Sequence, residues 1–346
     1  MRGFVVTGSV YLNSHVPIAI LPVLCFLGAL VWLDSFKLVT GRFLLGVVLS
    51  GALAAGAAYF SNVTAYQHFS GSFVAFSRYV SPFIEEAIKA IPVVVLFRMR
   101  RIGLLVDAAI IGFAVGAGFA LVENIYYLAN RLEAIFFIQV VRGLGTAIMH
   151  GGATAAFAVV TIVLQERRAS SGMHFFVPAL CVAAVLHSLY NHFLVQPLIA
   201  TLLIAGLLPV LFVLLFRYGE QNLRDWMESG MNAKLALLQE IRAGAFLDTP
   251  AGQYLEALRH RFSGETLADM LCYVRLHCEL ALRAQGILLM RETGWDEPPL
   301  DEEVVSQLTE LRHIERSIGR TGLAALHPLV AGSGKDRWQL TLLGHR

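Results

Sequence analysis

The chain has 346 residues, of which 56% are hydrophobic and only 15% charged, and its mean hydropathy is +0.63. A soluble globular domain is nearer a quarter charged, so this composition argues against a soluble protein and predicts one embedded in the lipid bilayer. The formal net charge of +2 comes without a basic stripe of interleaved aromatic residues, so no nucleic-acid partner is expected.

Hydropathy predicts seven membrane spans, each near the roughly 20 residues that cross a bilayer. The fold class expected is therefore all-α, a polytopic transmembrane helix bundle. The segment 61–79 is too polar to span, and its aromatic residues favour a helix lying at the membrane interface. The predicted spans are about 16–33, 42–60, 80–97, 103–128, 134–164, 175–195 and 198–216.

Charge density changes after the last span. Residues 1–216 hold 12 Lys and Arg against 7 Asp and Glu, whereas residues 217–346 hold 15 against 18. We predict a transmembrane domain over 1–216 and a helical cytoplasmic domain over 217–346. Helices are expected in the tail near 220–243, 250–261, 265–291 and 301–319. No catalytic motif appears there, so the tail is a candidate for regulation, oligomerisation or binding of a cytoplasmic partner.

Positive residues gather at alternate ends of the spans. By the positive-inside rule this predicts an N-terminus outside the cell and a cytoplasmic tail, with Arg78 as the main exception. The residues placed inside are Lys37, Arg42, Arg98, Arg100, Arg101, Arg167, Arg168, Arg217 and Arg224.

Ionisable and amide side chains lie within four consecutive predicted spans, the third to the sixth. Each ionised group at a helix centre costs roughly 2.5–3.5 kcal/mol, so these groups must face one another or a wet cavity. The predicted topology brings them to the outer half of the bilayer, and the Gly112–Gly116 GxxxG allows close helix approach. The candidates are Glu85, Glu86, Lys89, Glu123, Asn124, Arg142, His150, His187 and Asn191.

Each motif also has a purely structural interpretation. Lys89 follows Glu85 and Glu86 by one turn and could form a buried ion pair, but one lysine cannot neutralise two glutamates. His187 and Asn191 share one helical face as HxxxN, and such contacts also hold membrane helices together. Together, however, carboxylate, imidazole, amide and cation are the groups that peptide-bond hydrolysis requires.

Taken in order, these motifs resemble the PrsW family of intramembrane proteases, a family related to the CAAX prenyl endopeptidases and bacteriocin-processing proteins. The resemblance runs over about residues 75–195, through EExxK, the FALVEN stretch 119–124, the pair Arg142 and His150, and HxxxN. It implies a multi-pass protease of the bacterial inner membrane. Its implied substrates are single-pass membrane proteins resembling anti-sigma factors.

The resemblance also implies roles for individual residues. Glu85 or Glu86 would activate a water molecule with help from His150, while His187 and Asn191 would bind that water or stabilise the oxyanion. The remaining polar residues of these spans would support the site. The chain departs from the CAAX pattern EExxxR, because its cation Lys89 comes one residue earlier.

Two questions stay open at this level. No metal is expected, because Lys89 supplies a cation close to the glutamates, but zinc held by His150, His187 and Glu86 is the alternative. HExxH, a decisive zinc motif, does not occur. The rival functions are a proton-coupled transporter, which also uses intramembrane glutamates and histidines, and a non-enzymatic membrane scaffold.

Overall fold

The structure is a computed structural model that describes residues 20–344, apart from 22, 38, 131–140, 169–172, 300 and 331–333. Helices and no strands occur among the described residues, which confirms the all-α prediction. The chain divides into two compact units, Met1–Gly219 and Glu220–Arg346. The division lies close to the change in charge density at residue 217.

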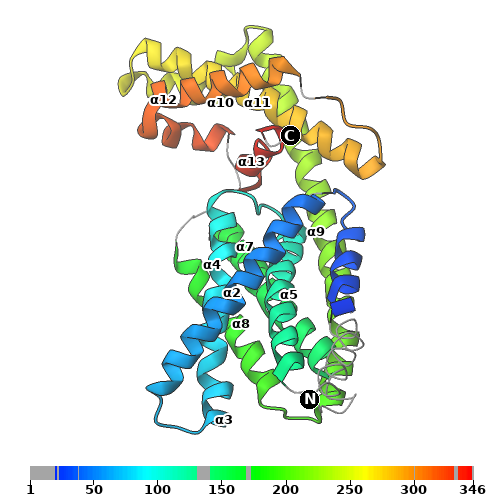
Figure 1. Ribbon diagram of the computed structural model, residues 1–346. Helices are drawn as coiled ribbons and strands as arrows, with labels where there is room; N and C mark the ends of the chain where they lie inside the picture. The colour runs from blue at the N-terminus through cyan, green and yellow to red at the C-terminus, as the bar shows by residue number, and fades with distance from the viewer. Residues whose placement is uncertain are drawn as a thin grey trace. The chain divides into compact units, whose positions relative to one another are not determined.

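The first unit is a helix bundle (Figure 1). Four described helical stretches are long and apolar enough to cross a membrane: Gly41–Gln67, Leu105–Tyr127, Gly143–Glu166 and Pro197–Arg242. Two more apolar helices are shorter, Val23–Trp32 and Phe176–Asn191. The predicted starts of the first and fifth spans lie outside the described residues. The main helices are α2 (Gly41–Gln67), α4 (Ser81–Arg98), α5 (Leu105–Asn130), α7 (Ala147–Arg168), α8 (Phe176–Asn191) and α9 (Pro197–Arg242).

Two predicted boundaries are wrong. Residues 61–67 belong to α2 rather than to a separate interfacial helix, and residues 73–80 form the short α3 (Phe73–Ala75) and a π-helical turn, η1 (Phe76–Val80). In the tail, 220–243 is not an independent helix, because α9 continues through it to Arg242. Hydropathy misplaced these two boundaries because polar residues do not by themselves end a helix. The backbones of α2 and α9 continue as helix through polar sequence.

Helix α5 forms the centre of the first unit and packs against α2 on one side and α7 on the other (Figure 1). The GxxxG motif explains how close these helices come: Gly112 faces the backbone of Thr154 and Ala155, and Gly116 faces that of His150 and Gly151. Helix α4 in turn contacts α2 and α8, and α7 contacts α8. The polar residues predicted from the sequence therefore come from helices that touch one another.

Gly116→Ala should lower the free energy of unfolding by about 1–3 kcal/mol, the usual cost of overpacking. A Cβ at this position would enter the van der Waals envelope of the His150 carbonyl oxygen and push α5 away from α7. Gly56→Ala on α2 is the matched control, because a Cβ there meets nothing within 4 Å. Thermal unfolding in detergent measures both, and equal stability of the two variants would contradict the close packing.

The second unit has its own apolar core, built on α10 (Pro250–Ala257), α11 (Gly264–Thr293) and α12 (Glu302–Val330). The side chain of Ser263 caps the start of α11. The backbone of α12 breaks at Gly319, whose φ of 69° is left-handed, where the sequence predicts a helix end. Two short helices follow, α13 (Gly334–Trp338) and α14 (Thr341–Gly344).

Candidate active site

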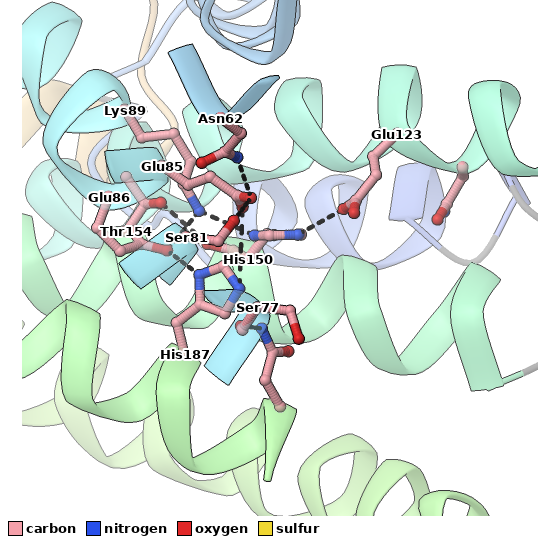
Figure 2. Close-up of polar contacts among 12 residues, drawn as sticks. Asn62, Ser77, Ser81, Glu85, Glu86, Lys89, Glu123, His150, Thr154 and His187 are labelled. Atoms are coloured by element: carbon pink, nitrogen blue, oxygen red, sulfur yellow. Dashed lines mark hydrogen bonds and ion pairs between the residues drawn. The ribbon is translucent and has the colours of Figure 1, made fainter. Parts of the chain in front are cut away.

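Five helices of the first unit supply a connected network of polar side chains (Figure 2). Glu85, Glu86 and Lys89 come from α4, and Glu123 comes from α5. His150 comes from α7, and its ring centroid lies 4.8 Å from that of His187 on α8. Helix α2 contributes Asn62. The structure thus brings both glutamates of EExxK and both predicted histidines to one place.

Lys89 is at the centre of this network and is fully buried. Its Nζ lies 2.5 Å from Oε1 of Glu86 and 2.8 Å from Nδ1 of His150, and it sits 4.6 Å from the centre of the Phe119 ring. His150 reaches Glu123 through its other nitrogen, with Nε2 2.7 Å from Oε2. The Lys89 ammonium group is therefore part of the site, in contact with both Glu86 and His150.

The donors and acceptors fix the protonation of His150. An ammonium group can only donate hydrogen bonds, so Nδ1 of His150 accepts from Lys89 and carries no proton. Nε2 then carries the proton and donates it to Glu123. In this arrangement His150 is a neutral imidazole oriented at both nitrogens.

His187 lies between the two glutamates. Its Nδ1 is 2.8 Å from Oε1 of Glu86, which accepts the bond, while its Nε2 faces Oε2 of Glu85 at 3.8 Å, beyond hydrogen-bond range. The imidazole of His187 therefore lies between the carboxylates of Glu86 and Glu85. Glu86 is 1% exposed and engaged by two partners, whereas Glu85 is 13% exposed.

The sequence did not single out Asn62 and Ser81 as site residues. Asn62 donates from Nδ2 to Oε1 of Glu85 at 2.9 Å, and Ser81 donates from Oγ to the same oxygen at 2.7 Å. Asn62 was missed because it fell in the polar segment assigned to the interface. The helical spacing of small residues on α2 was a usable signal, since Gly51, Ala55 and Ala58 are buried on the face that ends at Asn62.

Asn191 and Asn124 each donate a hydrogen bond to a backbone carbonyl. Asn191 donates from Nδ2 to the carbonyl of Ser77 at 3.0 Å, inside η1 and next to the start of α4. Asn124 donates to the carbonyl of Gly143 at 3.2 Å, inside a second π-helical turn, η2 (Val141–Thr146).

Each amide therefore binds a π-turn that leads into a helix carrying site residues, and π-turns are frequent at functional sites. Ser188 adds a bond from its Oγ to the carbonyl of Arg78 at 2.6 Å. The side chain of Arg142 lies outside the described part of the structure.

The residues that could hold a metal ion are Glu85, His150 and His187, whose ligand atoms lie within 4.8 Å of one another. Two histidines and one carboxylate form a catalytic zinc set, so the residue types fit. The sequence prediction named Glu86 as the carboxylate, whereas the ligand atoms that group here include Glu85, and Lys89 and His187 both contact Oε1 of Glu86. Lys89 also donates to Nδ1 of His150 and would have to release it for coordination through that atom.

Comparison with known proteins adds one match. A family model described as PrsW family intramembrane metalloprotease matches residues 35–217, which is more than half of the chain and includes every site residue named above. No curated protein and no solved structure matches the chain.

Proposed function

The chain belongs to the PrsW family of intramembrane proteases, and on that premise we propose that it hydrolyses peptide bonds with Glu85 as the general base. The observation that carries this assignment is the difference between the two glutamates. Each glutamate accepts two hydrogen bonds at Oε1, but the Oε2 of Glu86 is buried in a side chain that is 1% exposed, whereas the Oε2 of Glu85 is directed at His187 in a side chain that is 13% exposed. A base must reach the water that it deprotonates, and Glu85 meets this requirement.

In the proposed reaction, water binds at Oε2 of Glu85. The carboxylate takes one proton as the water oxygen attacks the scissile carbonyl carbon. His187, whose Nδ1–H is held by Glu86, accepts that proton at Nε2 and delivers it to the departing amine. The carbon–nitrogen bond then breaks and leaves an amine and a carboxylic acid, which ionises. Glu86 orients the imidazole and stabilises its charged form, as the buried aspartate does in a serine protease triad.

The oxyanion of the tetrahedral intermediate requires a hydrogen-bond donor. Asn191 lies one turn beyond His187 on α8, and an amide has two N–H groups, of which one is donated to Ser77. We propose that the second N–H group of Asn191 donates a hydrogen bond to the oxyanion. Removing one such donor typically costs a factor of about 10²–10³ in kcat.

We favour a metal-independent reaction because Lys89 lies beside His150. At 4 Å, two unit positive charges repel by about 4 kcal/mol at an effective dielectric constant near 20, and a divalent ion doubles this. Were a metal bound, Glu85, His150 and His187 would hold it, and it would supply a Lewis acid and an activated water. The geometric set and the family description are what favour this second candidate.

Activity should survive prolonged treatment with a strong chelator. The measurement is cleavage of a single-pass membrane reporter by the purified chain, with zinc content determined on the same sample. Activity that is lost on chelation and restored by zinc would overturn the metal-independent mechanism but not the protease assignment.

The substrates we propose are single-pass membrane proteins, including those that resemble anti-sigma factors. The proposed location is the bacterial inner membrane, with the N-terminus outside and the tail of residues 217–346 in the cytoplasm, free to bind a partner there. This orientation rests on the Lys and Arg bias and places the site in the outer half of the bilayer. A reporter fused after residue 230 should read as cytoplasmic, and a periplasmic signal would contradict the orientation.

A further inference from the structure

The carboxylate of Glu85 is held at one oxygen only. Asn62 and Ser81 both donate to Oε1, at 2.9 and 2.7 Å, while Oε2 faces Nε2 of His187 at 3.8 Å. Figure 2 shows Asn62 approaching Glu85 from α2 and His187 lying beyond it. Oε1 of Glu85 therefore accepts two hydrogen bonds, and Oε2 faces His187, where the proposed reaction takes place.

The two hydrogen bonds restrict rotation of the Glu85 carboxylate. The terminal torsion of a glutamate joins an sp³ carbon to an sp² carbon, so its rotational preference is broad and the carboxylate turns easily. Packing alone fixes such a group poorly, whereas two hydrogen bonds to one oxygen fix its plane. A reacting group misplaced by about 1 Å can lose a factor of about 10² in rate.

The packing of α2 brings Asn62 to this position. Gly51 faces the backbone of Val115 on α5, and Ala55 and Ala58 are buried farther along the same face, close to Phe119. These small residues let α2 lie close against the bundle, and Asn62 follows one turn after Ala58. An amide in this place donates from Nδ2, because an ionised carboxylate can only accept.

The other half of the amide is unsatisfied. Oδ1 of Asn62 is buried and has no hydrogen-bond partner among the described residues. An unpaired buried oxygen is unfavourable for folding, so stability alone does not account for an asparagine at this position. The bond from Nδ2 to Glu85 is the interaction that does account for it.

We propose that Asn62 is a positioning residue for the reaction, which with Ser81 holds Glu85 so that Oε2 remains the base. This rests on the proposed function above, since it assigns Asn62 to act through Glu85. It also adds α2, a helix that the sequence motifs leave out, to the active site.

Asn62→Asp, measured at neutral and at alkaline pH, is the sharpest test, because aspartate has nearly the same shape as asparagine but, once ionised, cannot donate and brings a negative charge to Oε1. We expect kcat for cleavage of a single-pass reporter to fall about 10- to 100-fold, the worth of a hydrogen bond to a charged group, while KM changes less than threefold. Asn62→Ala should lose no more activity than Asn62→Asp. Ser61→Ala, an exposed neighbour on α2, is the matched control and should cleave at the wild-type rate.

The outcomes separate the two levels of the proposal. Wild-type kcat for Asn62→Asp at both pH values, with Glu85→Gln inactive, would overturn the positioning role and leave the protease assignment standing. A slow Asn62→Ala beside an Asn62→Asp whose kcat stays normal as the pH rises would show a packing role and overturn it equally. Equal cleavage by wild type and Glu85→Gln would overturn both. Should Asn62→Asp fail to fold, Ser81→Ala removes the other donor without adding charge, and the same test applies: a fall in kcat supports the inference, and an unchanged kcat opposes it.

Discussion

Glu85→Gln should reduce the rate of peptide cleavage by a factor of about 10²–10⁴, the usual contribution of a general base. Glutamine keeps the length of the side chain and an oxygen that accepts from Asn62 and Ser81, so the local bonds of α2 and α4 can persist. What it removes is the proton-accepting oxygen that faces His187. The loss should therefore appear in kcat, while thermal unfolding stays close to that of the wild type.

One result would contradict this role of Glu85, and a second would show a role in folding instead. Cleavage at the wild-type rate would exclude it as the base. An inactive variant that has also lost its thermal transition would show that Glu85 supports the fold, and the loss of rate would then carry no information about catalysis. Glu123→Gln is a useful comparison, because that side chain contacts Nε2 of His150.

Glu86→Gln and Lys89→Met should each destabilise the protein by about 3–5 kcal/mol, the cost of removing one partner from a buried ion pair. The two side chains are 1% and 0% exposed, and their charged atoms lie 2.5 Å apart. Either substitution leaves the other charge in the bundle without its counterion. The measurement is the free energy of unfolding in detergent or in bilayers.

The double variant Glu86→Gln/Lys89→Met should recover most of the lost stability, because it removes both charges together. Activity should not recover, since Glu86 is also the partner of Nδ1 of His187. A double variant that is as unstable as the sum of the single variants would contradict the ion pair. Together with Glu85→Gln, this cycle separates the glutamate that reacts from the glutamate that holds the site together.

The helices and the principal site residues were predictable from the sequence, because both depend on local signals. Apolar stretches of membrane length predicted α5 and α7, and a charge within such a stretch marks a residue that must meet a partner. The GxxxG at Gly112 and Gly116 predicted the close approach that the structure has. On these grounds Glu85, His150 and His187 were predicted to share one site, and the structure brings them together.

The pairing within the site was not predictable in the same way. Nothing in EExxK distinguishes Glu86, which binds Lys89 and His187, from Glu85, because the distinction depends on which helix each side chain meets. Asn62 was missed for a related reason, since its partner is 23 residues away on another helix. Asn191 was predicted as a site residue, but its bond to the Ser77 carbonyl within a π-helical turn has no local signature in the sequence.

The most direct test is mass spectrometry of a single-pass reporter incubated with the purified wild-type chain and with Glu85→Gln in the same bilayers. We expect the wild type to produce two fragments that differ from the reporter by one added water at a single peptide bond, in chelator as well as in buffer, and Glu85→Gln to leave the reporter intact. Cleavage at the same bond and rate by both proteins would contradict the central claim that Glu85 activates the water.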